Sequence, residues 1–412
     1  MKKLLQYLGN YKKESILGPL FKLLEASFEL IVPLVMAAII DTGVANADRP
    51  YIMKMSLVLF LLALIGLTCA ITAQYFAAKA AVGCATGLRH ALFEHIETLS
   101  FTEMDTVGTS TLITRMTSDV NQVQNGVNLV LRLFLRSPFI VFGAMVMAFT
   151  IDVKAALVFV VTIPLLSVVV FGIMLVSIPL YKKVQAALDK VLGITRENLT
   201  GSRVIRAFNK EQDEIAQFHE DNEALTKIQL YVGKISALMN PLTYIIINGA
   251  IVVLVWVGAI RVDNGNITQG QVVALVSYMS QILVELIKLA NLIININKSI
   301  ACMNRIETVL DMESSITEHP AAETGSLTLD GAGREGKETI PAENAVVFSK
   351  VGLTYAGASE EALSDIDFTV RRGETIGIIG GTGSGKSSVV NLIPRFYDVT
   401  KGQVLVLSLI HI

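Results

Sequence analysis

The sequence is poor in the residues that build metal sites and disulfide frameworks. Its 412 residues include only three cysteines and five histidines. Cys69, Cys84 and Cys302 are far apart and form no Cys-x-x-Cys pair. His90 and His95 are five residues apart, which is not the i, i+4 spacing that places two ligands on one face of a helix. The pattern predicts neither a disulfide scaffold nor a zinc site.

Charge is also scarce. Asp, Glu, Lys and Arg make up 17% of the chain and leave a net charge of −2, whereas ordinary soluble chains carry about 25% charged residues. Hydrophobic residues make up 52%, and the mean hydropathy is +0.57. This composition excludes a disordered chain, a nucleic-acid-binding protein with a strongly basic face, and a purely soluble globular enzyme.

Long apolar runs account for this composition, and almost all of them precede residue 300. A helix needs about 20 apolar residues to cross a bilayer. Six stretches are long enough, at about 16–40, 56–78, 133–151, 155–180, 242–261 and 271–296. Only residues 152–154 separate the third stretch from the fourth, which predicts a tight helical hairpin. Residues 1–310 are therefore predicted to form an all-α membrane domain with six spans.

The distribution of positive charge predicts how this domain is oriented. Four lysines precede the first span, and residues 182–234 carry nine Lys and Arg side chains. The short connections at 41–55, 152–154 and 262–270 are poor in positive charge. By the positive-inside rule, the N-terminus, the two long connections and everything after residue 300 face the cytoplasm of a cell membrane.

The two long connections are predicted to be helical hairpins that extend from the membrane. Leu112, Met116 and Val120 recur at a spacing of four in the first connection, and the second shows a weaker version of the same pattern. Polar residues and Gly108 break the rhythm near 103–111 and 208–214, where the hairpin tips are expected. The residues assigned to the two tips are Met104, Asp105, Thr106, Asn209, Lys210 and Glu211.

Several charged side chains fall inside the predicted spans. Glu25 and Glu29 lie in the first span, and Glu285 begins a polar helix face in the sixth that continues through Lys288, Asn291, Asn295 and Lys298. An ionisable residue within a membrane is by default a functional hypothesis. Two interpretations stay open: the residues are solvated in cytoplasmic extensions of the helices, or they form the polar wall of a substrate cavity.

The composition changes after about residue 310. Residues 311–345 are rich in Glu, Gly, Thr, Ala and Pro, which is typical of a linker. Alternating apolar residues then predict strands at 346–351 and 363–370, and residues 374–379 predict a buried strand. A helical pattern follows from Ser388 to Ile393. Residues 346–412 are thus predicted to belong to an α/β domain.

The segment between the buried strand and the helix fits the phosphate-loop pattern G-x-x-x-x-G-K-[ST] in full. Its residues are Gly380, Gly381, Thr382, Gly383, Ser384, Gly385, Lys386 and Ser387. Glycines allow backbone N–H groups to approach phosphate oxygens, and the following helix presents its positive end to the same anion. Lys386 is expected to supply a positive charge to the β- and γ-phosphates of ATP, and the Ser387 hydroxyl to complete the coordination of Mg²⁺. Residues 346–412 are therefore predicted to be the incomplete N-terminal part of an α/β P-loop NTPase domain.

Six spans, long helical connections and a phosphate loop together resemble the exporter branch of the ABC transporters. The resemblance covers residues 1–406 and is to a half-transporter of the bacterial multidrug and lipid exporter type, in which membrane and nucleotide domains are fused. The matching runs are Gly108-x-x-x-x-Ile113-x-Arg115-x-x-x-Asp119-Val120, Glu197-Asn-Leu-Thr-Gly201 with Arg203-Val-Ile-Arg-Ala-Phe208, Val351-x-x-x-Tyr355, and Phe396-Tyr397-Asp398 with Gly402-Gln-Val-Leu-Val406.

The resemblance implies further roles. Tyr355 would stack on the adenine of ATP, and Ser388 would reach the α-phosphate. The hairpin tips would dock on nucleotide domains and transmit their closure. The family implies a second subunit as partner, in a homodimer or heterodimer, a membrane environment, and export of a drug, lipid or other amphipathic molecule whose identity the sequence does not reveal. No nucleic-acid partner is expected.

The resemblance stops after Val406. The glutamine loop, the signature loop, the second acidic motif with its catalytic glutamate and the switch histidine are absent from the sequence. The chain is therefore interpreted as truncated within the nucleotide domain, with its catalytic residues expected beyond Ile412. ATP hydrolysis at family-like rates is not expected from the chain alone. An ATP-gated channel or membrane sensor of the same architecture and a non-functional gene fragment are the alternatives.

Overall fold

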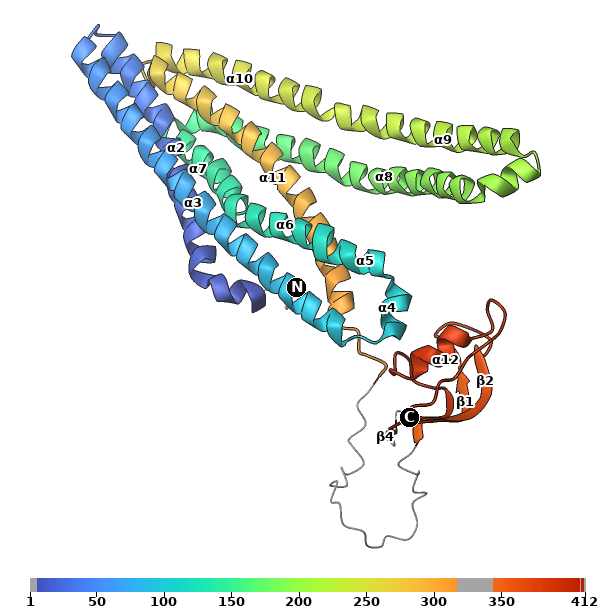
Figure 1. Cartoon of the computed structure of the whole chain (residues 1–412). Helices are drawn as coiled ribbons and strands as arrows, with labels where there is room; N and C mark the ends of the chain where they lie inside the picture. Colours follow the sequence, from blue (N-terminus) through green and yellow to red (C-terminus); the bar gives the residue numbers. More distant parts are fainter. Residues whose placement is uncertain (1–5, 317–343, 408, 411–412) are drawn as a thin grey trace, which may run out of the picture. The chain divides into compact units, whose positions relative to one another are not determined.

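The computed structural model describes residues 6–316, 344–407 and 409–410 (Figure 1). Most of the linker predicted at 311–345, and three of the last five residues, lie outside this part of the chain. The described residues divide into two compact units. Residues 6–84 and 124–300 belong to one, and the described parts of 85–123 and 301–412 belong to the other. The helices α3 and α11 contribute residues to both.

Within the described residues, six helical segments are long and apolar enough to cross a membrane, which confirms the predicted number of spans. Each predicted span lies inside one of them. The segments are Gln6–Val44, Arg49–Thr98, Thr109–Ile151, Val153–Thr200, Glu211–Asp263 and Gln269–Leu310. Their main helices are α2 (Lys12–Ala38), α3 (Arg49–Thr98), α7 (Arg136–Ile151), α8 (Val153–Ala207), α10 (Met239–Asp263) and α11 (Gln269–Leu310).

The first long connection is helical, as predicted, and reverses direction at short breaks. After α3, the chain forms α4 (Phe101–Val107), α5 (Thr109–Thr114), the π-helix η3 (Arg115–Asp119) and α6 (Val120–Leu133). Gly108, with φ of 82°, separates α4 from α5. The left-handed region suits glycine because a Cβ atom is strained there. The Arg115 and Arg305 guanidinium groups donate to the buried Asp119 carboxylate over 2.9 and 2.5 Å, and these bonds tie this connection to the end of α11.

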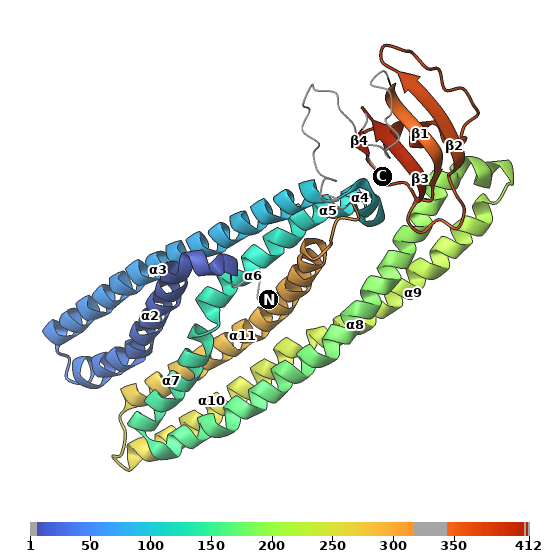
Figure 2. The ribbon, with the colours of Figure 1, turned by 90° about the horizontal axis from the view of Figure 1, so that it is seen from below.

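The second long connection is a pair of antiparallel helices. Figures 1 and 2 show α8 and α9 (Glu211–Ala237) side by side over their length, with α10 continuing the direction of α9. Only Phe208, Asn209 and Lys210 separate α8 from α9. Asn209 adopts a left-handed φ of 51°, which asparagine tolerates better than most residues. The predicted tip therefore coincides with the turn between the two helices.

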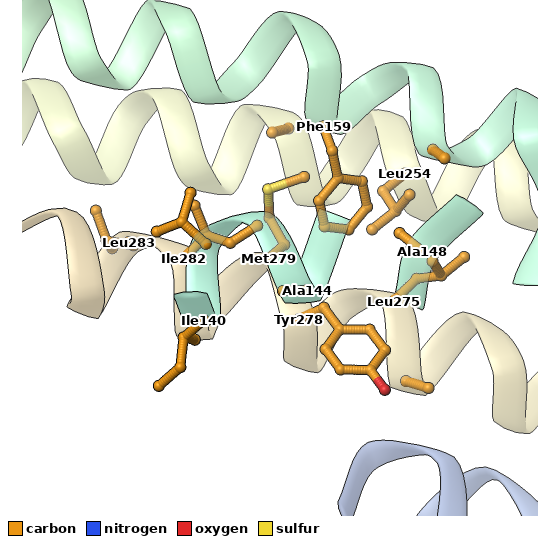
Figure 3. Packing of buried hydrophobic residues seen from close by; sticks show 14 of the residues in the cluster. Ile140, Ala144, Ala148, Phe159, Leu254, Leu275, Tyr278, Met279, Ile282 and Leu283 are labelled. Carbon is orange, nitrogen blue, oxygen red and sulfur yellow. The ribbon is translucent and has the colours of Figure 1, made fainter. Parts of the chain in front are cut away.

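The membrane helices pack around a core of buried hydrophobic residues. Figure 3 shows Phe159 of α8 and Leu254 of α10 directed toward Met279 of α11, and all three side chains are fully buried. Alanines such as Ala144 on α7 line the same contact, and small residues let membrane helices approach closely. Tyr278, also buried, donates its hydroxyl to the Leu30 carbonyl of α2 over 2.6 Å. The core thus joins α2 and α7 to α8, α10 and α11.

Two aspartates organise the short connections between membrane helices. Asp152, the single residue between α7 and α8, accepts from the Ala155 N–H and pairs with Arg261 of α10. Burial opposes its charge, but these donors hold the pKa of the Asp152 carboxyl below its usual value. Asp41 similarly accepts from the Thr268 hydroxyl and the Gly270 N–H at the start of α11. The tight hairpin predicted at 152–154 is confirmed.

The remaining described residues form a small antiparallel sheet with one short helix. The strands β1 (Asn344–Leu353), β2 (Leu363–Arg371), β3 (Lys401–Val406) and β4 (Leu409–Ile410) lie in the order β2-β1-β3-β4, as Figure 2 shows. The helix α12 (Lys386–Leu392) begins at the phosphate-loop lysine. Phe348, Val389, Leu392 and Val404 form the buried core between α12 and the sheet. The strands predicted at 346–351 and 363–370 are present.

The buried strand predicted at 374–379 is wrong for this structure. These residues form no strand, and the side chain of Ile379 is 98% exposed. A strand needs a neighbouring strand to pair with, and no strand of the described sheet pairs with residues 374–379. The described residues also provide no second layer over Ile376 and Ile378. The apolar pattern therefore predicted a burial that the described residues do not provide.

The contact between Gly270 and α2 can be tested. A Cβ atom at Gly270 would lie 2.4 Å from the Ala37 carbonyl oxygen and 2.8 Å from its Cα. Because backbone atoms cannot move aside easily, Gly270→Ala should lower the free energy of unfolding by about 1–3 kcal/mol. A reduced midpoint of thermal unfolding in detergent is expected. Gly249→Ala, whose Cβ meets nothing within 4 Å, is the matched control, and equal midpoints would contradict the prediction.

Candidate functional site

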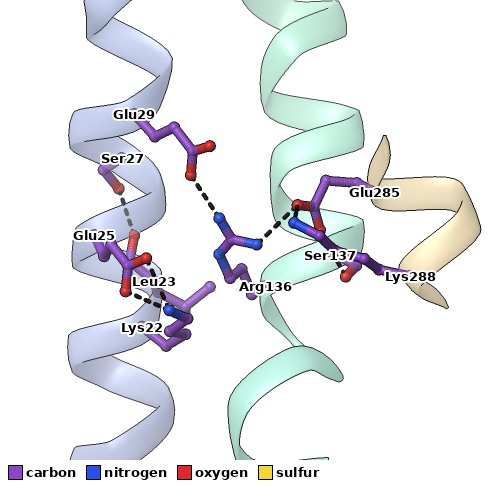
Figure 4. A network of polar contacts seen from close by, with 9 residues as sticks. All are labelled: Lys22, Leu23, Glu25, Ser27, Glu29, Arg136, Ser137, Glu285 and Lys288. Carbon is purple, nitrogen blue, oxygen red and sulfur yellow. Dashed lines mark hydrogen bonds and ion pairs between the residues drawn. The ribbon is translucent and has the colours of Figure 1, made fainter. Parts of the chain in front are cut away.

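The membrane helices contain an ion-pair network around Arg136. Figure 4 shows its guanidinium between α2 and α11, where it donates to Glu29 over 2.6 Å and to Glu285 over 2.8 Å. The Ser137 hydroxyl and the Lys288 ammonium also donate to Glu285. Arg136 is 7% exposed and Glu285 is 2% exposed. One arginine therefore joins three membrane helices through two carboxylates.

The network lies within the apolar layer. Counted along their helices from the short connections, Glu29, Arg136 and Glu285 lie about 22–24 Å away at 1.5 Å per residue. The hydrocarbon layer of a bilayer is about 30 Å thick. At this depth charged groups are costly unless they are paired. With Lys22 and Glu25, which pair on α2, the network has three acidic and three basic side chains and is neutral.

The charged residues of the spans were expected either to be solvated or to form the polar wall of a cavity. The structure answers this differently for different residues. Glu285 is not solvated, because it is buried and bonded to Arg136, Ser137 and Lys288. Further along the same helix face, Asn291 and Lys298 are exposed. Glu25, Glu29 and Arg136 line one side of a cavity of about 380 Å³ whose remaining wall comes from apolar residues of α2 and α3.

Sequence reasoning missed Arg136 and Ser137. The available signal was a single basic residue inside the third predicted span, opposite acidic residues in the first and sixth spans. Charge complementarity between spans could have suggested the pairing. Which helices are neighbours was not known from the sequence, so the specific partners could not be assigned.

Two glycines of the predicted phosphate loop have left-handed backbone conformations. Gly383 and Gly385 adopt φ of 85° and 83°. A Cβ at Gly385 would also lie 2.6 Å from the Leu363 side chain. The Lys386 ammonium folds over the loop and donates to the Gly380 and Gly381 carbonyl oxygens over 2.9 and 2.6 Å. Among the described residues it pairs with no carboxylate, so its charge is available to an anion.

The other predicted loop residues lie on the surface beside Lys386. Gly380, Gly381, Thr382, Ser384 and Ser387 are exposed. The Ser384 hydroxyl accepts from the Lys386 ammonium over 3.2 Å. An exposed loop of this shape presents its backbone and hydroxyl groups to solvent, which is what Mg·ATP would need in order to bind.

Tyr355 is the residue expected to stack on the adenine of ATP, and Ser388 is the residue expected to reach the α-phosphate. The two lie close together in the structure. The Tyr355 hydroxyl donates to the Ser388 hydroxyl oxygen over 2.8 Å. The Tyr355 ring also contacts Tyr397 edge to face, with 5.1 Å between ring centroids. Ser388 is buried on α12, and Tyr355 is half-buried after β1. The structure thus brings together the two residues predicted for opposite ends of an adenosine phosphate.

The first hairpin tip belongs to the same unit as this site. The Tyr397 hydroxyl donates to the Asp105 carboxylate of α4 over 2.6 Å, and Phe101 of α4 packs on Phe396 with centroids 4.4 Å apart. The bond to Asp105, together with burial, raises the pKa of Tyr397 to about 12. Asp105 and Thr106 line a cavity of about 450 Å³ with Tyr355 and Tyr397. Met104 is half-buried on the same helix.

The second hairpin tip lies in the other unit. Asn209 and Lys210 are exposed, Glu211 is half-buried, and Lys210 pairs with Asp213 over 2.7 Å. Phe208, beside them, is 73% exposed. Phe208 therefore presents its aromatic ring to solvent at this turn.

Six helices suited to a membrane, followed in one chain by a phosphate-binding loop, define an ATP-linked membrane protein. Two family models match the chain: the ABC transporter transmembrane region matches residues 15–286, and the ABC transporter model matches residues 363–409. The chain belongs to the ABC transporter family, with fused membrane and nucleotide-binding regions.

Similar proteins agree with this assignment. An uncharacterised ABC transporter ATP-binding protein of Mycobacterium tuberculosis is 33% identical over 97% of this chain and 67% of its own length. A putative multidrug export ATP-binding/permease protein of Bacillus subtilis is 29% identical over 98% and 69%. An ATP-dependent lipid A-core flippase of Pseudoalteromonas translucida is 27% identical over 97% and 66%. The chain therefore spans about two thirds of the length of these relatives.

Removing the charge of Arg136 should destabilise the membrane domain. Arg136→Met leaves Glu285 buried with reduced compensation, and breaking a buried pair in this way costs about 3–5 kcal/mol. A lower midpoint of thermal unfolding in detergent is expected. Adding Glu285→Gln should recover part of the loss, because the uncompensated charge is then removed. Arg203→Met, at an exposed position of α8, is the control. If Arg136→Met and Arg203→Met unfolded at the same temperature, the role of the network would be refuted.

Proposed function

We propose that this protein is one subunit of an exporter that uses ATP to move a drug, lipid or other amphipathic molecule across the cell (inner) membrane. The observation that carries the proposal is the phosphate loop, with Gly383 and Gly385 in left-handed conformations and Lys386 unpaired by any described carboxylate. A second subunit, identical or different, is expected as partner, because members of this family typically act as dimers. The N-terminus and the nucleotide domain are proposed to face the cytoplasm.

The residues around the loop fit a magnesium nucleotide. Lys386 would contact the β- and γ-phosphates, and the Ser387 hydroxyl would complete the coordination of Mg²⁺, which shields charge between the phosphates. Ser388 would reach the α-phosphate, and Tyr355 would provide an aromatic face to the adenine, worth about 1–3 kcal/mol. The exposed loop backbone would supply the remaining donors.

We propose that the two hairpin tips connect nucleotide domains to the membrane helices. At the first tip, the bond between Asp105 and Tyr397 and the packing of Phe101 on Phe396 support such a connection. At the second tip, the exposed Phe208 beside Asn209 and Lys210 offers an apolar contact for a partner domain. ATP would then shift the membrane helices by binding one of two conformations more tightly.

The ion-pair network around Arg136 is proposed as the polar wall of the transport path. Glu25, Glu29 and Arg136 line a cavity that also has a broad apolar wall. Glu29 is the most accessible of the three, with 41% of its side chain exposed. An amphipathic molecule would place its polar part against this wall and its apolar part against α2 and α3. The cavity has a charged side and an apolar side, which supports an amphipathic substrate.

The nucleotide assignment is tested through Lys386. Lys386→Ala removes the only charge that the loop offers to the β- and γ-phosphates, and one interaction with a charged group contributes about 1.5–3 kcal/mol. Affinity for Mg·ATP, measured by displacement of a fluorescent nucleotide from the detergent-solubilised chain, should fall by about tenfold or more. Arg372→Ala, at an exposed cation of the same domain, should leave affinity unchanged. Equal affinity in the two variants would disprove the nucleotide site.

We also propose that these 412 residues bind ATP without hydrolysing it at rates like those of the family. Phosphoryl transfer needs a group that positions the attacking water and donors on both sides of the transferred phosphate. Among the described residues, Lys386 contacts only oxygens of its own loop. Phosphate release by the purified chain in lipid should therefore equal that of its Lys386→Ala variant. Faster release that is lost in Lys386→Ala would show that the chain is a complete catalyst.

A further inference from the structure

A groove between α8 and α10 is lined by apolar and small residues and by one hydroxyl group. It has a volume of about 500 Å³ and lies between residues 157–165 of α8 and 245–253 of α10. Thr162 and Ala250 are buried in it, whereas Val161 is 69% exposed. The Thr162 hydroxyl donates to a carbonyl of its own helix over 2.7 Å, so it needs no partner in the groove. The groove therefore suits a hydrocarbon chain.

This groove lies at the depth of the hydrocarbon layer. At 1.5 Å per residue, its α8 residues lie about 6–18 Å from Val153 and its α10 residues about 15–27 Å from Asp263. The bond from Arg261 to Asp152 holds these two helix ends together. Because the hydrocarbon layer is about 30 Å thick, the groove is surrounded by lipid acyl chains and not by water.

Lys154 lies above the groove on the same face of α8. It precedes Leu157 and Val158 by three and four residues, and residues at these spacings are neighbours on a helix surface. Its side chain is exposed and forms no ion pair with another described residue. The nearby Arg261 already pairs with Asp152. The Lys154 ammonium is therefore available to an anion, and its long stem allows it to reach the membrane surface.

The same end of α10 carries an aromatic ring and a carboxylate. Trp256 follows Val253 by three residues and is 71% exposed, and tryptophan is enriched where membrane helices meet the lipid headgroups. Asp263, about two turns further along, is exposed and has no ion-pair partner within the described ranges. Measured from the bond that joins the two helix ends, Lys154 lies on the membrane side and Asp263 on the water side. The positive group is therefore the deeper one.

We propose that this groove binds one glycerophospholipid whose headgroup ends in a primary amine, as in phosphatidylethanolamine. One acyl chain lies between α8 and α10, the phosphate accepts from the Lys154 ammonium, and the amine donates to the Asp263 carboxylate. This order matches the headgroup, in which the phosphate lies closer to the acyl chains than the amine does. In the proposed orientation, the lipid belongs to the leaflet away from the cytoplasm.

This lipid is a bound partner and not the exported molecule. The cavity proposed for transport is lined by α2, α3 and Arg136, whereas the groove is formed by α8 and α10. The two share no residue. The lipid site rests on the insertion of these helices in a membrane and does not depend on the nucleotide site.

The fluorescence of Trp256 reports on this groove, because the sequence contains one tryptophan. The 412-residue chain is placed in phosphatidylcholine vesicles with a small fraction of a lipid whose acyl chains are brominated and quench tryptophan on contact. Three brominated lipids are compared: phosphatidylethanolamine, phosphatidylglycerol and diacylglycerol. The affinity for phosphatidylethanolamine should exceed that for diacylglycerol by about fivefold, the effect of one lysine near a charged membrane surface. Phosphatidylglycerol, which lacks the amine, should be intermediate.

Two substitutions test the headgroup contacts. Lys154→Gln removes the phosphate contact, so the affinities for both phospholipids should fall to that for diacylglycerol. Asp263→Ala removes the amine contact, so the two phospholipids should become equal and remain above diacylglycerol. Lys54→Gln, at an exposed lysine near the start of α3, is the matched control and should preserve all three affinities.

A third substitution tests the groove itself. A Cβ atom at Gly249 meets nothing within 4 Å, so Gly249→Leu should fill the groove without a clash and abolish the preference for phosphatidylethanolamine. Gly172→Leu, at an equally open and exposed position of α8 outside the groove, should preserve it.

The outcomes separate a bound lipid from ordinary boundary lipid. Equal quenching by the three brominated lipids in the unmodified chain would show boundary lipid only and overturn the proposal. A preference that persists in Lys154→Gln or in Gly249→Leu would overturn the assigned site. Lys154→Gln and Asp263→Ala change exposed side chains and should leave the midpoint of thermal unfolding in detergent unchanged, which separates lost selectivity from misfolding. A chain that fails to bind ATP should still show the preference.

Discussion

A buried arginine constrains how three helices of the membrane domain are arranged. The Arg136 guanidinium cannot remain in an apolar layer without counter-ions, and its two carboxylate partners come from helices far apart in the sequence, Glu29 on α2 and Glu285 on α11. The three helices must therefore keep one relative position while the network is intact. The apolar contacts of Phe159, Tyr278 and Met279 fill the space between helices, but contacts of that kind are less specific about which partner they meet.

The same requirement for compensation appears outside the membrane core. Asp152 at the junction of α7 and α8 is held by Arg261, and Asp119 in the first long connection is held by Arg115 and Arg305. Each pair joins segments that the sequence separates by 100 residues or more, except for the local bond from Arg115. Buried or half-buried carboxylates thus mark the places where long, otherwise simple helices are attached to one another. The ion pairs determine how these long helices are aligned with one another.

The phosphate loop differs from the membrane domain, because its conformation depends on neighbouring residues and not on ion pairs between distant segments. Gly383 and Gly385 need left-handed conformations, and their spacing is readable in the sequence because other residues are strained there. The strand expected at 374–379 did not form, since the described residues supply neither a hydrogen-bonding partner nor a covering layer for Ile376 and Ile379. The local pattern therefore agrees with the glycine conformations of the loop and was insufficient for the strand beside it.

The sequence by itself determined the six membrane helices, the breaks at Gly108 and Asn209, and the phosphate loop, because hydrophobic periodicity, glycine conformation and loop length act over a few neighbouring residues. Only the tertiary structure decided that Arg136 lies between Glu29 and Glu285, and that Tyr397 bonds to Asp105, 292 residues away. Such pairings depend on which helix faces meet, and each face offers several chemically acceptable partners. The choice is made by packing of the whole chain, which no local pattern records.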